Sequence, residues 1–292
     1  MLKAGPNNVC HPYVAGEPTC ADMGPAGPHV THTNGSYNIR ASEPWRSYAG
    51  MLYSGALNAS VVKDIVGYNQ YHEKLSHIGA WGGVGGFRNQ IMSFTEQGHG
   101  YGLVQHGMAE PFLLQLYSEM AHVCTRGSWT CFESRGIPNF TPPGGYTTPS
   151  QSIVPLHVKW MLVWEDPLLA NTVVLCKTTP RSWLQHGERI SVRRAPTTLG
   201  ARVSFNITSS LSGATPTITA DVAFAPAGPA GDANGSIDAS LALRAPRPYR
   251  IKSVEVDGKA YERFDPSMET LKLPAVPKGV DVAMHVVVTY TE

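Results

Sequence analysis

The order of apolar and polar residues changes once along the chain, from a helical period to a period of two. Between about residues 42 and 166, apolar residues recur three or four positions apart, the spacing that places them on one face of an α-helix. From about Asn171 onward, apolar residues alternate with polar or small ones, as in a strand with one buried face. The pattern therefore predicts a helical part followed by a β part, with the boundary near Asp166-Pro167.

Four helices are expected in the first part. Ser42 and Pro44 mark the start of one that runs to about Ala56, and a second begins after Ser60. A third is expected over residues 109–124, and a fourth over about 152–164 with Pro155 in its first turn. The second helix is expected to bury Val61, Ile65, Tyr68, His72 and Leu75. The third is expected to bury Leu113, Leu116, Tyr117, Met120 and Cys124, and the fourth Ile153, Leu156, Trp160 and Val163.

The β part contains roughly eight short alternating segments separated by turn residues, which predicts an antiparallel β-sandwich of about 120 residues. Asp257-Gly258 is expected to form a hairpin turn between two of its strands. Residues 1–41 are rich in Pro, Gly, Asn and Thr and predict an irregular arm. The expected fold is α + β and multidomain, with an arm at 1–41, a helical domain at 42–166 and a β-sandwich domain at 167–292.

The loop between the third and fourth helices holds a carboxylate, Glu133, close to Arg126, Ser128 and Trp129. A long Gly- and Pro-rich loop between two buried helices is a common place for catalytic residues, because the helices form a rigid scaffold. Glu133 is therefore the first candidate catalytic residue.

Several stretches, together with the order of helix pairs and then a sandwich, resemble the C-terminal portion of secreted six-hairpin, or (α/α)6-barrel, glycosidases. The matching stretches are Tyr101–His106, Tyr117–His122, Arg126–Thr130, Thr179–Leu184 and Ala195–Gly200. The likeness covers residues 42–292 and does not specify a substrate. It implies that the helices form part of an (α/α)6 toroid and that the protein acts on carbohydrate.

In glucoamylase-like members of this architecture, a carboxylate on the loop between the last two barrel helices is the general base, and Glu133 matches that position. An inverting hydrolase needs this base to deprotonate water, opposite an acid roughly 6.5–9.5 Å away that protonates the leaving oxygen. The alternative is that Glu133 forms a salt bridge with Arg126 or Arg135 and only orders the loop.

Glu96 is the second catalytic candidate, because the glycines after it would let the backbone approach a ligand closely. A loop-capping role is the alternative for Glu96. His99, His106 and Arg126 are candidates for sugar hydroxyl contacts, and Trp81 and Trp129 for stacking on sugar rings. The alternatives are structural histidines and core tryptophans. No metal site and no cofactor are expected.

The 23 basic and 22 acidic side chains give no electrostatic case for nucleic acid or an anionic membrane as partner. No stretch of the sequence reaches the roughly 18 apolar residues of a membrane span. An excess of Asn-x-Ser/Thr triplets favours the secretory route, and glycosylation itself is not implied. These triplets begin at Asn34, Asn58, Asn139, Asn206 and Asn234.

The five cysteines also favour an oxidising, extracellular compartment. Cys10 with Cys20, and Cys124 with Cys131, are each spaced to close a short disulfide. Cys176 lies in an apolar segment and is expected to be a buried free thiol. The sequence contains no C-x-x-C pair, which argues against a zinc site or a thioredoxin-type motif.

A closed toroid needs twelve helices, about 350 residues at ordinary helix and loop lengths, whereas only residues 42–166 are helical in pattern. The chain is therefore expected to be a fragment, or a subunit whose missing N-terminal region or partner chain completes the barrel. The apolar faces around Trp45, Tyr48, Leu52, Val61 and Ile65 would then lack neighbours and drive association.

The leading hypothesis is the C-terminal part of a glycoside hydrolase that acts on a polysaccharide or glycoconjugate. A non-catalytic carbohydrate-binding or scaffold protein is the main alternative. A polysaccharide lyase is the third, and it would need a Tyr or His base beside a charge-neutralising group for the uronate.

Overall fold

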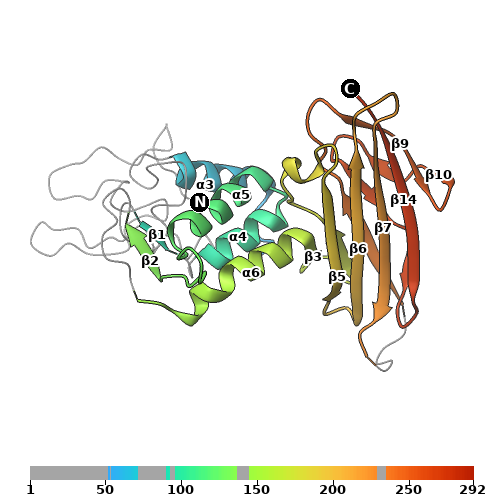
Figure 1. The fold of residues 1–292 in the computed structure, drawn as a ribbon. Helices are drawn as coiled ribbons and strands as arrows, with labels where there is room; N and C mark the ends of the chain where they lie inside the picture. Colours follow the sequence, from blue (N-terminus) through green and yellow to red (C-terminus); the bar gives the residue numbers. More distant parts are fainter. Residues whose placement is uncertain (1–51, 53, 72–89, 93–95, 137–144, 229–234) are drawn as a thin grey trace, which may run out of the picture. The chain divides into compact units, whose positions relative to one another are not determined.

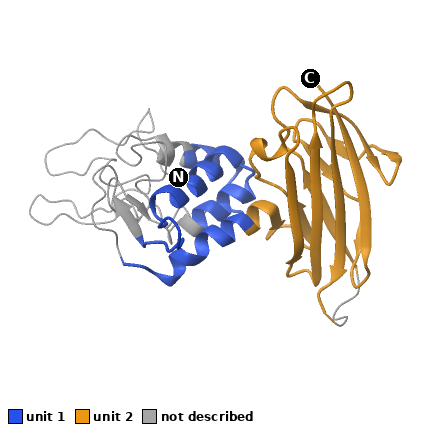
Figure 2. Cartoon of the chain, viewed as in Figure 1, with its two compact units in different colours: residues 1–158 blue, residues 159–292 orange. Residues whose placement is uncertain are grey.

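We describe the protein from a computed structural model, which covers residues 52, 54–71, 90–92, 96–136, 145–228 and 235–292 (Figure 1). The chain divides into two compact units, residues 1–158 and residues 159–292 (Figure 2). Helices dominate the first and strands the second, which confirms the expected α + β class and the order of the two parts. The predicted arm, the helix at 42–56 except Leu52, and Cys10, Cys20 and Trp81 lie outside the described residues.

The described part of the helical unit contains four α-helices and one small antiparallel pair of strands. The helices do not form a closed toroid within this part of the chain. The elements are α3 (Ala59–Tyr71), β1 (Gln90–Met92), α4 (Glu96–Gln105), α5 (Ala109–His122), β2 (Ser134–Gly136) and α6 (Thr148–Leu162).

Helix α3 confirms the helix expected after Ser60, although its buried residues differ from the prediction. The Asn58 side chain caps the helix by accepting a hydrogen bond from the Val61 amide over 3.0 Å. Val62 and Val66 are buried, whereas Val61 is only partly buried. The side chains of Ile65 and Tyr68, and all of His72 and Leu75, lie outside the described residues.

Helix α4 occupies a segment that we expected to be a glycine-rich loop open to a ligand. Its glycines instead allow contact with the protein's own side chains. A Cβ added at Gly100 would lie 2.4 Å from Nε2 of His157, and one at Gly102 would lie 2.5 Å from Cβ of Leu52. Leu52 is fully buried, so the prediction that it lacks neighbours is wrong.

Helix α5 is present where expected, with Pro111 in its first turn, and its predicted buried stripe is right for Leu116 and Cys124 only. Tyr117 is 47% exposed and Leu113 is only partly buried. The buried residues are Ala109, Phe112, Gln115, Leu116 and Glu119. The apolar pattern identified only part of this face because two of its members, Gln115 and Glu119, are polar.

Helix α6 begins at Thr148, four residues before the expected start, so that Pro155 lies inside the helix and not in its first turn. Ile153, His157 and Met161 are buried at four-residue intervals, whereas Leu156 and Trp160 are only partly buried. The helix ends at Leu162 because the next three residues pair as a strand with residues 173–175.

The second unit contains two six-stranded sheets and one short 3-10 helix, Arg181–Leu184. The first sheet has the strand order β10-β9-β14-β7-β6-β5, and all of its pairs are antiparallel. Its strands are β5 (Arg189–Pro196), β6 (Ala201–Ser210), β7 (Thr217–Pro226), β9 (Arg250–Val256), β10 (Lys259–Tyr261) and β14 (Val282–Thr291).

The second sheet has the order β11-β12-β8-β4-β3, with β13 also paired to β8. Its strands are β3 (Val163–Glu165), β4 (Thr172–Leu175), β8 (Ser236–Ala242), β11 (Phe264–Asp265), β12 (Thr270–Lys272) and β13 (Val276–Pro277). The pair β4–β8 is parallel, which departs from the purely antiparallel sandwich that was expected. Strands also begin at Val163, slightly before the predicted boundary.

The alternating pattern correctly located the core of the sandwich. The inward residues of β6, β7, β8 and β14 join one buried cluster, which includes Phe205, Val222, Leu241 and Val286. The Asp257-Gly258 turn also forms as predicted between β9 and β10, and both of its residues have positive φ, at 51° and 74°.

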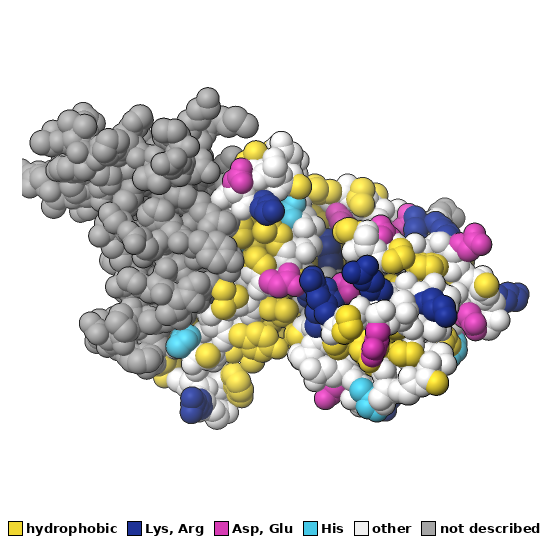
Figure 3. Space-filling view, turned by 90° about the horizontal axis from the view of Figure 1, so that it is seen from above, with side chains coloured by type: hydrophobic (Ala, Val, Ile, Leu, Met, Phe, Trp, Pro, Cys, Tyr) yellow, Lys and Arg dark blue, Asp and Glu magenta, His cyan; other side chains and the backbone are white. Residues whose placement is uncertain are grey.

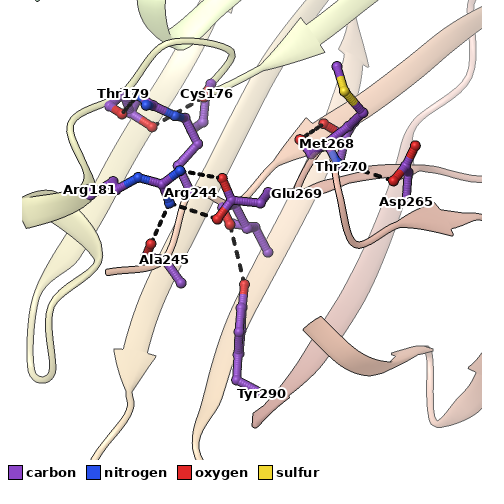
Figure 4. Close-up of polar contacts among 11 residues, drawn as sticks. Cys176, Thr179, Arg181, Arg244, Ala245, Asp265, Met268, Glu269, Thr270 and Tyr290 are labelled. Atoms are coloured by element: carbon purple, nitrogen blue, oxygen red, sulfur yellow. Dashed lines mark hydrogen bonds and ion pairs between the residues drawn. The ribbon is translucent and has the colours of Figure 1, made fainter. Parts of the chain in front are cut away.

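Two arginines connect separate segments of the second unit through hydrogen bonds (Figure 4). The Arg181 guanidinium donates two hydrogen bonds to the Glu269 carboxylate, at 2.7 and 2.6 Å, and a third to the Ala245 carbonyl. Arg244, which is 8% exposed, donates to the carbonyl of Thr179 over 2.8 Å. These contacts tie the segment around the 3-10 helix to the residues that follow β8 and precede β12.

The cysteine predictions within the described residues are confirmed. Cys124 and Cys131 form a disulfide, and Cys176 is a buried free thiol. Burial raises the pKa of the Cys176 thiol. The disulfide is compatible with an extracellular location. None of the described helices is long and apolar enough to cross a membrane.

Side chains of both charge signs lie on the one face of the described residues that Figure 3 draws. On the face drawn in Figure 3, acidic and basic side chains are interspersed over the part that is not grey.

Candidate functional site

The candidate site is the loop that joins α5 to α6, and its first half is a small closed turn. The Cys124–Cys131 disulfide closes the turn, and the Thr125 amide donates to the carbonyl of Thr130 over 2.9 Å. Inside it Trp129 has a φ of 53°, an unusual value for a residue with a side chain. Trp129 is 57% exposed, so the turn presents an indole ring to solvent.

The second half of the loop pairs two aromatic rings. Phe132 and Tyr146 form an antiparallel bridge, and their rings stack with centroids 4.3 Å apart and an interplanar angle of 21°. Phe132 is partly buried, whereas Tyr146 is 58% exposed. The stack therefore provides a second exposed aromatic surface on the same loop.

Glu133 follows this aromatic pair directly. Its backbone amide donates to the carbonyl of Gly145 over 2.9 Å, which fixes the backbone at this position. Its side chain is partly buried. Among the described side chains no ion pair joins Glu133 to Arg126, which is exposed, while the side chain of Arg135 lies outside the described residues. Of the two partners proposed for a salt bridge with Glu133, Arg126 is therefore excluded.

Gln151 of α6 holds the loop from the other side. Its side-chain oxygen accepts a hydrogen bond from the Cys131 amide over 2.9 Å, and its side-chain nitrogen donates to the Cys131 carbonyl. Cys131 is 2% exposed, so Gln151 supplies partners for two buried backbone groups. Sequence reasoning missed this residue, since a Gln near a helix start carries no signal of a loop contact.

The remaining predicted site residues are not gathered around Glu133 by any recorded contact. Glu96 is the first residue of α4, and its side chain lies outside the described residues, as does all of Trp81. His106 is partly buried, and its Nε2 lies 2.7 Å from the carbonyl oxygen of Leu52. That contact supports the structural alternative for His106.

His99 is fully buried inside the helical unit, where its Nδ1 lies 2.7 Å from Oε1 of Gln115. Burial is the largest influence on this imidazole and lowers its pKa well below the ordinary value. The geometry favours a structural histidine over one that meets sugar hydroxyls from solvent.

A second buried polar pair was not expected from the sequence. His157 of α6 and Glu119 of α5 are both fully buried, and Nδ1 lies 3.8 Å from the carboxylate oxygen. Burial lowers the pKa of His157 to about 3. One sequence signal could have placed these polar residues on buried faces, namely their four-residue spacing. Gln115 and Glu119 are four residues apart, and His157 lies four residues from both Ile153 and Met161.

Within the described residues, no group of three or more His, Cys, Asp or Glu side chains is arranged to hold a metal ion. The described part of the loop offers a partly buried carboxylate, Glu133, and the exposed rings of Trp129 and Tyr146 on an anchored backbone. Aromatic faces and a carboxylate suit a ligand with both apolar ring faces and hydroxyl groups, which describes a sugar.

Comparison with known proteins leaves the family open. No protein-family model matches the chain, and no curated protein matches it.

Proposed function

We propose that this chain acts on carbohydrate as part of a glycoside hydrolase, with Glu133 as the general base that activates water. The observation that carries the proposal is that Glu133 directly follows Phe132, whose ring stacks on that of Tyr146, on the same anchored segment. Its backbone is anchored to Gly145, and its carboxylate is only partly buried. A base must be held rigidly and still reach a bound water, and this arrangement meets both needs.

In this proposal the exposed rings of Trp129 and Tyr146 bind sugar faces, and α5 and α6 correspond to the last two helices of an (α/α)6 toroid. The general acid would come from a region of the protein or a partner chain outside the described residues. The resemblance to six-hairpin glycosidases and the loop between two helices support this reading.

The second candidate function is carbohydrate binding without catalysis. One observation favours it: Glu119, the carboxylate near the end of α5, is fully buried against His157 and is not available to a substrate. The aromatic surfaces and Glu133 would then bind sugar with no acid opposite the base.

The test compares the wild-type protein, together with the region or partner chain that supplies the general acid, with its Glu133→Gln variant and with Trp129→Ala plus Tyr146→Ala. Binding and hydrolysis of neutral oligosaccharides built from glucose, mannose or xylose are measured for each. The amide keeps the shape of the carboxylate and loses its basicity, so Glu133→Gln is expected to remove most turnover while binding persists. The aromatic double variant should lose binding itself.

Binding that depends on the aromatic rings, in a wild-type chain without turnover, would favour the non-catalytic candidate. Unchanged turnover in Glu133→Gln would eliminate the proposed base.

A further inference from the structure

A row of polar side chains crosses the outer face of the first sheet, far along the chain from the loop. The strand register places them side by side on β5, β6, β7 and β14, and the row ends at the turn between β9 and β10 (Figure 1). The row consists of Ser191, Asn206, Asp221, His285 and Asp257.

Contacts within the row hold it in place. His285 Nδ1 lies 2.6 Å from a carboxylate oxygen of Asp221, and the His285 amide donates to a carboxylate oxygen of Asp257 over 2.8 Å. Ser191 donates its hydroxyl proton to the side-chain oxygen of Asn206 over 2.7 Å. Asp221 and His285 remain 69% and 51% exposed, so the row is both ordered and accessible.

An open depression of about 350 Å³ lies along this row. It lies next to the row, where the register places Ser204, Ala223 and Ala283 on β6, β7 and β14. The side chains at these positions are small and leave space, and the row of polar side chains borders that space on one side. The volume is at the lower end of the range for small-molecule sites.

The side chains of the row retain both hydrogen-bond donors and hydrogen-bond acceptors for a ligand. Asp221 and Asp257 each accept hydrogen bonds through one carboxylate oxygen, so the second oxygen can accept from a ligand. Asn206 accepts through its side-chain oxygen, so its NH2 group can donate to a ligand. Nε2 of His285 has no recorded partner among the described residues. A hydroxyl group both donates and accepts, so neighbouring hydroxyls of a sugar can use carboxylate, amide and imidazole in turn.

The same arrangement argues against other ligands. Asp221 lies on β7 and Asp257 in the turn after β9, and the described residues hold no group of three His, Cys, Asp or Glu side chains arranged for a metal ion. The side chains that line the depression include two carboxylates and no Lys or Arg, and the guanidinium of Arg189 is engaged with the Asn206 oxygen over 3.3 Å. An anionic sugar such as a uronate would therefore be repelled.

We propose that this depression is a second saccharide-binding site, selective for neutral oligosaccharides and separate from the Glu133 loop. From Asn206 to Asp257 the row crosses three strand spacings, roughly 14 Å, which favours an oligosaccharide over a single sugar. The inference rests on the sheet alone and does not require hydrolysis at Glu133.

The test is a titration of the full chain with neutral hexasaccharides of glucose, mannose or xylose, and with hexagalacturonate as the anionic comparison. Binding is followed by NMR, with the imidazole signals of His285 as the local reporter. The variants are Asp221→Ala and Asn206→Ala, with Glu255→Ala as a matched control because it removes an exposed carboxylate from the neighbouring β9. Trp129→Ala tests the loop separately.

We expect at least one neutral oligosaccharide to shift the His285 signals, and Asp221→Ala to weaken that binding at least about tenfold, as the loss of a hydrogen bond to a carboxylate does. Glu255→Ala and Trp129→Ala should leave it unchanged. If no neutral oligosaccharide shifts these signals, if Asp221→Ala has no effect, or if hexagalacturonate binds equally well, the sheet site does not exist. Binding lost only in Trp129→Ala would overturn the sheet site and leave the loop proposal standing.

Discussion

The imidazole of His157 lies so close to Gly100 that a methyl group added to the glycine would come within 2.4 Å of Nε2 and 2.9 Å of Cε1. Two effects therefore oppose each other in Gly100→Ala. Alanine favours the helix by about 1 kcal/mol, whereas overpacking against a buried ring costs about 1–3 kcal/mol or more. At this distance from a fully buried ring we expect overpacking to win and the free energy of unfolding to fall.

Chemical denaturation of Gly100→Ala measures that change. Gly145→Ala is the control, because a Cβ at Gly145 meets nothing within 4 Å. A double-mutant cycle with His157→Ala should show that the cost of the added methyl group shrinks when the ring is removed. An equal cost in both backgrounds would mean that another contact causes it.

The buried histidines predict a pH dependence of the helical unit. An unfolded chain protonates each histidine below about pH 6.5, whereas the folded pKa of His157 is about 3 and that of His99 is also lowered. Below pH 6.5 the unfolded state therefore binds more protons than the folded state. The free energy of unfolding should fall as the pH drops, by up to roughly 1.4 kcal/mol per pH unit for each histidine.

Amide hydrogen exchange between pH 7 and pH 5, corrected for the intrinsic exchange rates, follows this loss in α4, α5 and α6. The strands of the sandwich serve as an internal reference in the same sample. His157→Gln should reduce the pH dependence of the helices, because it removes one of the two groups. An unchanged pH dependence in that variant would contradict the assignment to His157.

The Gln151 contacts predict a role in positioning Glu133. Gln151→Ala leaves the amide and carbonyl of buried Cys131 without their partner, and each such loss costs about 1–3 kcal/mol. We expect faster exchange of the Glu133 amide and, if Glu133 is the base, a lower kcat with a smaller change in KM.

Ser152→Ala is the control for Gln151, because Ser152 is an exposed neighbour whose hydroxyl bonds only to its own helix. Gln151→Glu keeps the acceptor for the Cys131 amide but places a carboxylate against the Cys131 carbonyl, so it should also loosen the loop. Normal exchange at Glu133 in both Gln151 variants would show that the Gln151 contacts do not position Glu133.

Two of the ion pairs in the second unit, Arg181–Glu269 and Lys272–Asp238, should differ in their contribution to stability. Arg181 and Glu269 are 26% and 19% exposed and joined by two hydrogen bonds, so a double-mutant cycle should give a coupling of about 1–3 kcal/mol. The side chains of Lys272 and Asp238 are 45% and 53% exposed, and Nζ of Lys272 lies 3.4 Å from Oδ1 of Asp238. Their coupling should be under about 1 kcal/mol and should vanish in high salt. Equal couplings would show that burial does not strengthen the first pair.

Much of the sandwich follows from local sequence. Successive side chains of a strand point to opposite faces, so the alternation along Val203–Ile207 and Ile218–Phe224 already identifies which residues enter the core. The Asp257-Gly258 turn was equally local, because positive φ at two adjacent residues favours few residue types. Local sequence did not predict the parallel pair β4–β8, because this pairing joins segments more than sixty residues apart.

The helical unit depends more on tertiary contacts. Apolar spacing located α3, α5 and α6, but it identified only part of the buried face of α5, because Gln115 and Glu119 also lie inside. Such residues are buried only where another element supplies a partner, here His99 and His157. The sequence of one helix does not contain that partner.

The candidate site divides in the same way. The sequence by itself determined the chemical groups, Glu133 beside aromatic residues on a loop closed by two cysteines, because these are neighbours along the chain. Only the tertiary structure decided that Tyr146 stacks on Phe132, that Gln151 fixes Cys131, and that Asn206, Asp221 and His285 form one row. Those contacts join residues far apart in sequence, and packing and hydrogen bonding between separate elements select them.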